Sequence, residues 1–248
     1  MRKPIIVGNW KMYKNSEEAR KLVEELIPLV KDATSDIVVC VPFPLLHVVQ
    51  PLIKGTNITL GAQNVSWEDE GALTGEVSAK MLKDFDVKYV IVGHSERKRV
   101  FGEKCREIGM RAVQAVKNGI TPIVCVGETL ERRNRDAKSY IKIQLLEVLE
   151  DIEDISKVVI AYEPVWAING IKPATKEQAE EMCAFIREVI KEKYCEEAAD
   201  VVRIQYGGSV NSSNFADFMA MDSIDGGLIG RACLDAKEFS KIINYQDK

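Results

Sequence analysis

Eight short runs of apolar, mostly β-branched residues recur along the chain. Within each run the polarity does not alternate, which is typical of strands buried on both faces of a parallel sheet. Longer stretches with helical spacing of their apolar residues separate the runs. The pattern predicts strands over residues 5–7, 37–41, 58–60, 89–92, 121–126, 158–161, 202–205 and 227–229.

The intervening stretches predict amphipathic helices. One begins near Ser16 and carries its apolar stripe to Val30, and similar stripes cover residues 103–117 and 141–152. Thr175 followed three residues later by Gln178 is a capping signal, which predicts that another helix begins there. The third strand is followed by a longer polar connection, residues 64–75, before its helix.

Alternating strands and helices indicate an α/β fold with a parallel sheet and helices outside it. Dividing 248 residues among eight units gives 31 residues per unit, the size of a βα repeat. We therefore expect one domain, residues 1–248, folded as a closed (β/α)8 barrel with eight parallel strands. A doubly wound open sheet is the competitor. It normally carries a glycine-rich dinucleotide turn after the first strand, where this chain has Gly8-Asn9-Trp10-Lys11.

Composition narrows the class of protein. Apolar residues make up 46% of the chain and charged residues 29%, and the net charge is −4, which argues against a nucleic-acid-binding protein. The longest apolar stretch, residues 37–49, is short and broken by two prolines, so no membrane span is expected. The six cysteines are scattered without a C-x-x-C pair, which predicts reduced thiols, no metal site and a cytoplasmic location.

Polar residues follow most of the predicted strands. In a barrel of this kind, function gathers at the carboxyl ends of the strands. Charged groups at so many strand ends are costly to bury in a simple core, so their convergence indicates a site. Glycine-containing turns offer free backbone N–H groups of the kind that bind phosphate, and a lysine adds positive charge. The residues at these strand ends are Asn9, Lys11, Gln63, Asn64, His94, Ser95, Glu96, Arg97, Glu128, Glu163, Ser209, Gly230 and Arg231.

Most of these residues lie in segments similar to those of the triosephosphate isomerase family, and the resemblance extends along essentially the whole chain. The segments occur in order and at family spacing, and together they are far more specific than any one of them. They are GNWKM (8–12), GAQN (61–64), GALTGE (71–76), GHSER (93–97), FGE (101–103), CVGE (125–128), AYEPVWAI (161–168) and YGGSVN (206–211).

This resemblance implies interconversion of dihydroxyacetone phosphate and glyceraldehyde 3-phosphate on a TIM barrel. The reaction moves a proton between adjacent carbons through an enediol or enediolate, so it needs a base and a carbonyl polariser but no cofactor and no metal. Carried over from the family, Glu163 is the base and His94 the electrophile. Lys11 holds the phosphate and stabilises developing charge, and Asn9 binds substrate oxygens. Glu96 has either a catalytic role or a structural ion pair, with Lys11 as the expected partner.

For phosphate binding, the resemblance points to Asn169, Ser209, Gly230 and Arg231. Residues 163–175 resemble the family's closing loop, but residues 169–173 depart from its usual tip and second hinge. Arg231 stands where the family usually has glycine, and its side-chain role stays open. We also expect Ser95 to cap the helix after His94.

The loop from Gly71 to Glu76 matches the segment with which the family forms dimers, so we expect a homodimer, with Thr74, Glu76 and Arg97 as interface candidates. Two other functions remain open. One is another phosphosugar barrel enzyme, such as an aldolase or epimerase. The other is a non-catalytic barrel that binds phosphate without turning it over.

Overall fold

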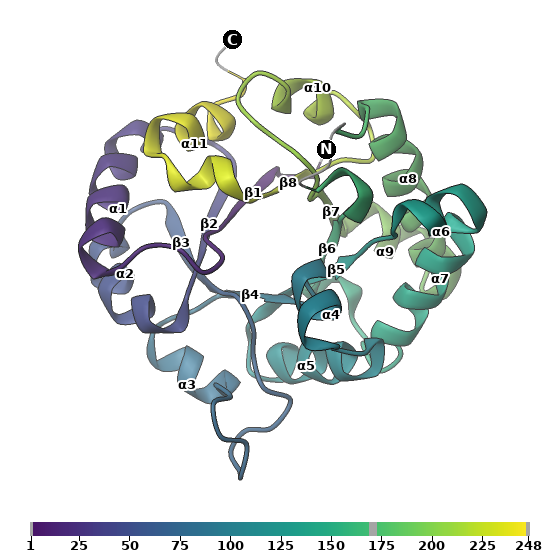
Figure 1. Ribbon diagram of the computed structural model, residues 1–248, viewed down its shortest axis with the longest axis horizontal. Helices are drawn as coiled ribbons and strands as arrows, with labels where there is room; N and C mark the ends of the chain where they lie inside the picture. The colour runs from purple at the N-terminus through teal and green to yellow at the C-terminus, as the bar shows by residue number, and fades with distance from the viewer. Residues whose placement is uncertain (1, 169–172, 247–248) are drawn as a thin grey trace.

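Eight parallel strands close into a barrel in sequence order, with β1 hydrogen-bonded to both β2 and β8 (Figure 1). The computed structural model describes residues 2–168 and 173–246. The strands are β1 (Ile5–Asn9), β2 (Asp36–Val41), β3 (Ile58–Ala62), β4 (Tyr89–Val92), β5 (Thr121–Val126), β6 (Val159–Tyr162), β7 (Arg203–Tyr206) and β8 (Gly226–Ile229). The predicted fold class is confirmed, and each predicted strand lies within two residues of an observed one.

Helices surround the barrel in a ring (Figure 1). They are α1 (Ser16–Val30), α2 (Leu46–Ile53), α3 (Ala79–Asp84), α4 (Ser95–Phe101), α5 (Cys105–Lys117), α6 (Leu130–Arg135), α7 (Ala137–Val148), α8 (Lys176–Lys193), α9 (Glu196–Val201), α10 (Phe215–Met219) and α11 (Ala236–Ile243). The expected start of α8 is confirmed, because Thr175 and Gln178 form a reciprocal capping box. Asn15 and Glu18 form a similar box at α1.

The two faces of the strands enter two different cores, because side chains alternate along a strand. One set of alternate residues, including Ile5, Val7 and Cys125, forms a small cluster with its counterparts on the other strands, inside the barrel. The opposite set, including Ile6 and Val124, joins the helices in a much larger cluster. Both faces of each strand are therefore apolar, which explains the unbroken apolar runs in the sequence.

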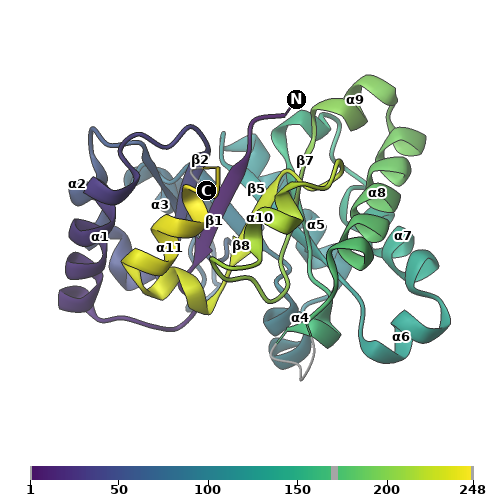
Figure 2. The same cartoon turned by 90° about the horizontal axis from the view of Figure 1, so that it is seen from above.

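The candidate site residues lie at one end of this barrel. Figure 2 shows α4 and α6 at the end toward which β1 runs. The candidate residues directly follow the carboxyl ends of the strands, which lie at that end. At the opposite end, Asp225 accepts hydrogen bonds from Arg2, Arg187 and the backbone of Ile204. That ion cluster joins the chain's beginning to β7 and β8, and it is remote from the candidate site.

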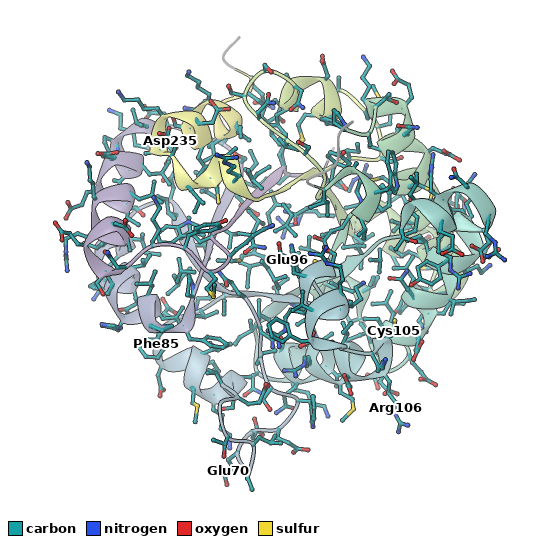
Figure 3. The ribbon with its side chains drawn as sticks, viewed as in Figure 1. Glu70, Phe85, Glu96, Cys105, Arg106 and Asp235 are labelled. Carbon is teal, nitrogen blue, oxygen red and sulfur yellow. The ribbon has the colours of Figure 1, made fainter. Side chains whose placement is uncertain are left out.

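The polar connection between β3 and α3 projects from the barrel (Figure 1). Glu70 lies at its tip (Figure 3). Arg111 of α5 is buried beneath the projection, where it donates to the carbonyl oxygen of Val65 and to Glu76 at 2.7 Å. The guanidinium also lies over the ring of Trp67. These contacts hold the projecting segment, residues 63–78, in one shape against its own barrel.

The six cysteines all lie in described residues and are free, and four of them are buried. No helix within residues 2–168 and 173–246 is long and apolar enough to cross a membrane.

Candidate active site

A cavity of about 100 Å³ lies at the carboxyl ends of the strands. Seven of the predicted site residues line it, and they come from five different strand ends: Asn9, Lys11, His94, Glu163, Ser209, Gly230 and Arg231. Glu96 lies just outside it, near the barrel axis in projection (Figure 3), and contacts Lys11. Asn169, with the lid-tip residues 170–172, lies outside the described residues.

Glu163 and His94 are in direct contact in the cavity wall. Glu163 Oε1 lies 2.9 Å from His94 Nε2, and Glu163 Oε2 accepts from the backbone N–H of Ser95 at 2.8 Å. The Glu163 residue is only 1% exposed. Two glycines make room for it: a Cβ at Gly127 would lie 1.8 Å from the Glu163 carbonyl oxygen, and one at Gly207 would lie 3.0 Å from Glu163 Cγ.

Burial and charge act on this pair in opposite directions. Burial raises the pKa of Glu163, but His94, Lys98 and the Ser95 amide outweigh it, so the pKa lies below its ordinary value. Burial lowers the pKa of His94, but the adjoining Glu163 carboxylate outweighs that effect and raises it. Glu163 is therefore ionised at neutral pH.

Helix α4 begins directly at this pair. The backbone N–H of Glu96 donates to His94 Nδ1 at 3.2 Å, so His94 is the N-cap and Ser95 is the first helical residue. The prediction that Ser95 caps the helix is wrong, because the His94 imidazole accepts from the free N–H of Glu96. An imidazolium cannot accept that bond, so the contact favours a neutral ring with its proton on Nε2.

Lys11 is held in an unusual backbone conformation, with φ of 52°. Asn9 Oδ1 accepts from the Lys11 N–H at 3.0 Å, and Gln63 Nε2 donates to the Lys11 carbonyl oxygen at 2.9 Å. Such strain persists only where the surroundings over-determine it. The ammonium forms the expected ion pair with Glu96, at 2.6 Å.

Two backbone turns complete the lining of the cavity. The Gly-Gly-Ser turn does not open directly into a helix, because α10 begins only at Phe215 and Asn211 to Asn214 form turns of their own. Gly230 does precede a helical turn, the 3-10 segment η4 (Arg231–Leu234). Ser209 and Gly230 therefore reach the cavity as turn residues.

Two supporting residues were missed by sequence reasoning. Lys98 donates from Nζ to the carbonyl oxygen of Cys125 at 3.0 Å and to Gln144 Oε1 at 3.1 Å. Gln144 in turn donates to the carbonyl oxygen of Gly127, beside Glu163. The position of Lys98, directly after the GHSER segment, was the available signal. Gln144 lies mid-helix in α7, so only the fold brings it to the site.

A further buried carboxylate lies below the start of the predicted lid. Glu128 Oε1 accepts from Tyr162 Oη and from Trp166 Nε1, both at 2.9 Å. Burial raises the pKa of Glu128 against the opposing effect of these two donors. Trp166 belongs to the short turn η3 (Val165–Ala167) that follows Glu163, so this hydrogen bond ties that turn to the segment that follows β5.

The residues described hold no group of three histidine, cysteine or acidic side chains arranged for a metal ion. The functional groups of the site are a buried carboxylate, an imidazole donor, an ammonium and backbone amides. Together they suit removal of a proton beside a carbonyl group in a phosphorylated substrate.

The comparisons with known proteins agree with this geometry. The sequence model of the family described as triosephosphate isomerase matches residues 4–246. The chain is 53% identical to the triosephosphate isomerase of Caldanaerobacter subterraneus subsp. tengcongensis, over 99% of this chain and all of that one. It is 50% identical to that of Thermoanaerobacter sp. (strain X514) and 49% identical to that of Clostridium perfringens (strain 13 / Type A), with the same coverage. The chain belongs to the triosephosphate isomerase family.

Proposed function

We propose that Glu163 and His94 carry out the triosephosphate isomerase activity of this chain, the interconversion of dihydroxyacetone phosphate and glyceraldehyde 3-phosphate in glycolysis. The Glu163 carboxylate removes a proton from the carbon beside the substrate carbonyl. His94 Nε2–H donates to the carbonyl oxygen while negative charge develops there. The proton then returns to the neighbouring carbon. The observation that carries this assignment is the 2.9 Å contact between the two groups in one buried cavity wall.

The same contact explains how the acid–base states suit the reaction. Glu163 is ionised and so can accept a proton. When substrate enters, its carbonyl oxygen replaces Glu163 as the acceptor for His94 Nε2, and the carboxylate turns to the carbon. The Glu163 carboxylate then raises the pKa of His94 less, while the hydrogen bond from the Glu96 amide still favours the neutral ring. A neutral donor matches the weak acidity of the enediol better than an imidazolium does.

The remaining site residues bind and orient the substrate. The Lys11 ammonium attracts the phosphate and the enediolate, and Glu96 holds that ammonium in place. Asn9 fixes the Lys11 backbone and presents its amide to the substrate. Backbone N–H groups at Ser209, Gly230 and Arg231 grip the phosphate, and Asn169 adds a contact from the lid.

The test is a coupled assay of glyceraldehyde 3-phosphate isomerisation with Glu163→Gln beside the wild type. Removing a general base costs about 10²- to 10⁴-fold, so kcat of the variant should fall by about that factor. Glu188→Gln removes an exposed carboxylate from α8 on the outer ring and should leave kcat unchanged. If wild type and Glu163→Gln are equally slow but both bind inorganic phosphate, the chain is a non-catalytic phosphate-binding barrel.

We also propose that two copies form a symmetric dimer through the loop from Gly71 to Glu76. A mainly apolar cavity of about 350 Å³ lies beside the active site, between Lys11 and Phe101. Its neighbours Met12 and Phe101 are 93% and 68% exposed. Large apolar side chains that are this exposed in a single copy are typical of a surface that a partner covers. A two-fold axis lets each projecting loop fill the other copy's cavity.

Of the interface candidates, Thr74 lies in the loop and is the one to test. The other two candidates already have partners in the same chain: Glu76 pairs with Arg111, and Arg97 pairs with Glu103. Glu76 and Arg97 therefore stabilise the proposed interface surface from within their own chain. Thr74→Arg should give a monomer in sedimentation velocity with much reduced kcat, because the Lys11 region loses its cover. A Thr74→Arg monomer with wild-type kcat at the same concentration would overturn the proposal that the dimer completes the site.

A further inference from the structure

The charges around the cavity are unevenly matched. Lys11 is already paired with Glu96 at 2.6 Å, and Glu163 contacts His94. Arg231 also lines the cavity, and its side chain is exposed. Within residues 2–168 and 173–246, no carboxylate forms an ion pair with Arg231 and no hydrogen bond from its guanidinium is found. Among the described residues, Arg231 is therefore the charged residue of the lining without an ionic partner.

A charge count shows what this cation changes. With His94 neutral, Lys11, Glu96 and Glu163 together carry one net negative charge. A triose phosphate brings up to two more negative charges at neutral pH, so an additional cation beside these groups strengthens the attraction of the site for its substrate. Arg231 brings the net charge of these groups to zero, and it does so at the rim, where an approaching anion is still solvated.

The position of Arg231 matches the phosphate end of the cavity. It directly follows Gly230, and a Cβ on Gly230 would lie 3.5 Å from Lys11 Cε and 3.8 Å from Lys11 Nζ. The Lys11 side chain therefore passes over the same turn from which Arg231 extends. A guanidinium is well suited to phosphate, because its planar N–H groups can bind two oxygens at once.

We propose that the guanidinium of Arg231 is a substrate-recognition group that attracts and holds the phosphate of the triose phosphate from the rim of the cavity. The proposal rests on the proposed function and assigns a role to this side chain beyond its backbone N–H. It is a binding role, not a catalytic one, because the guanidinium meets the non-reacting end of the substrate.

This role predicts a specific kinetic pattern. A contact to the phosphate acts equally on substrate and transition state, so its loss raises KM and leaves kcat unchanged. The contact is exposed, and we therefore expect a moderate effect, about a three- to tenfold rise in KM. Added salt screens the attraction, so kcat/KM of the wild type should fall with ionic strength more steeply than that of a variant without the charge.

The experiment compares Arg231→Gln with Arg231→Lys, which keeps the charge. Lys237→Gln is the matched control, because Lys237 is an exposed cation of α11 six residues further on and outside the cavity lining. The readouts are KM and kcat, the inhibition constant of inorganic phosphate, and the salt dependence of kcat/KM. Phosphate affinity is also measured by calorimetry, which does not require turnover.

In the expected result, Arg231→Gln raises KM and weakens phosphate binding by similar factors, Arg231→Lys restores most of both, and Lys237→Gln resembles the wild type. Unchanged KM, phosphate affinity and salt dependence in an active Arg231→Gln enzyme would overturn the inference. Equal losses in Arg231→Gln and Lys237→Gln would also overturn it, because only general surface charge would then matter. If the wild type binds phosphate without turnover, the proposed function fails, and calorimetry still decides the role of Arg231.

Discussion

Replacing Gly127 by alanine tests how closely the position of the base depends on its neighbour. The added Cβ would lie 1.8 Å from the Glu163 carbonyl oxygen, whereas real Cβ atoms stay at least 3.0 Å from such atoms. The backbones of residues 127 and 163 must therefore move apart by about 1.2 Å, the difference between these distances. Gly127 does not have a positive φ, so the change acts through this contact and not through backbone strain.

The expected loss of activity follows from that displacement. A misplacement of about 1 Å at a reacting group can cost about 10²-fold in rate. We expect kcat of Gly127→Ala to fall by about that factor in the isomerisation assay, with a smaller change in KM because the phosphate grip is untouched. Overpacking also costs about 1–3 kcal/mol of stability, measured by urea unfolding.

Gly109→Ala separates the two effects. Its Cβ would lie 2.9 Å from the carbonyl oxygen of Val148, between α5 and α7 and away from the cavity. This variant should lose stability and keep kcat. Gly127→Ala with kcat within threefold of the wild type would refute the reasoning, since the base would then tolerate the displacement or the backbone would absorb it elsewhere.

Three further predictions concern buried carboxylates. The folded pKa of Glu163 lies below 4.5, so its ionisation stabilises the fold above that pH and is lost as pH falls below it. The stability difference between wild type and Glu163→Gln, from urea unfolding, should therefore shrink from pH 5 to pH 3; a difference independent of pH would contradict this. Asp225→Ala leaves Arg187 without its buried partner and should cost about 3–5 kcal/mol, seen as a Tm lower by roughly 10 °C, with kcat at low temperature unchanged. Trp166→Phe removes a hydrogen-bond donor from Glu128, whose pKa is already raised. The loss in the free energy of unfolding that this substitution causes should therefore be larger at pH 7 than at pH 4.5. Equal losses at the two pH values would refute that assignment.

The sequence predicted the barrel closely because its strands have both faces buried. In the run around Cys125, one face packs inside the barrel and the other against helices, so every position must be apolar. Such runs are easy to recognise, and their number and spacing indicate closure. The candidate site was predictable for a related reason, because charged residues at the ends of buried strands have few purely structural explanations.

Errors arose where one polar group competes with another for the same partner. Ser95 is a normal capping residue by type, but the His94 imidazole accepts the Glu96 amide instead. The Asn211 and Asn214 side chains likewise form local turns, and α10 begins only at Phe215. Propensity cannot rank these local hydrogen bonds, because their geometry depends on how the neighbouring strands are placed.

The sequence by itself determined the number of strands, their buried character and the identity of most chemical groups at the site, because these depend on local patterning. Only the tertiary structure decided which groups touch. It paired Lys11 with Glu96 and brought Gln144 of α7 to the backbone beside Glu163. It also left Arg231 without an ionic partner among the described residues. These contacts join positions far apart along the chain, and the closure of the barrel sets their distances.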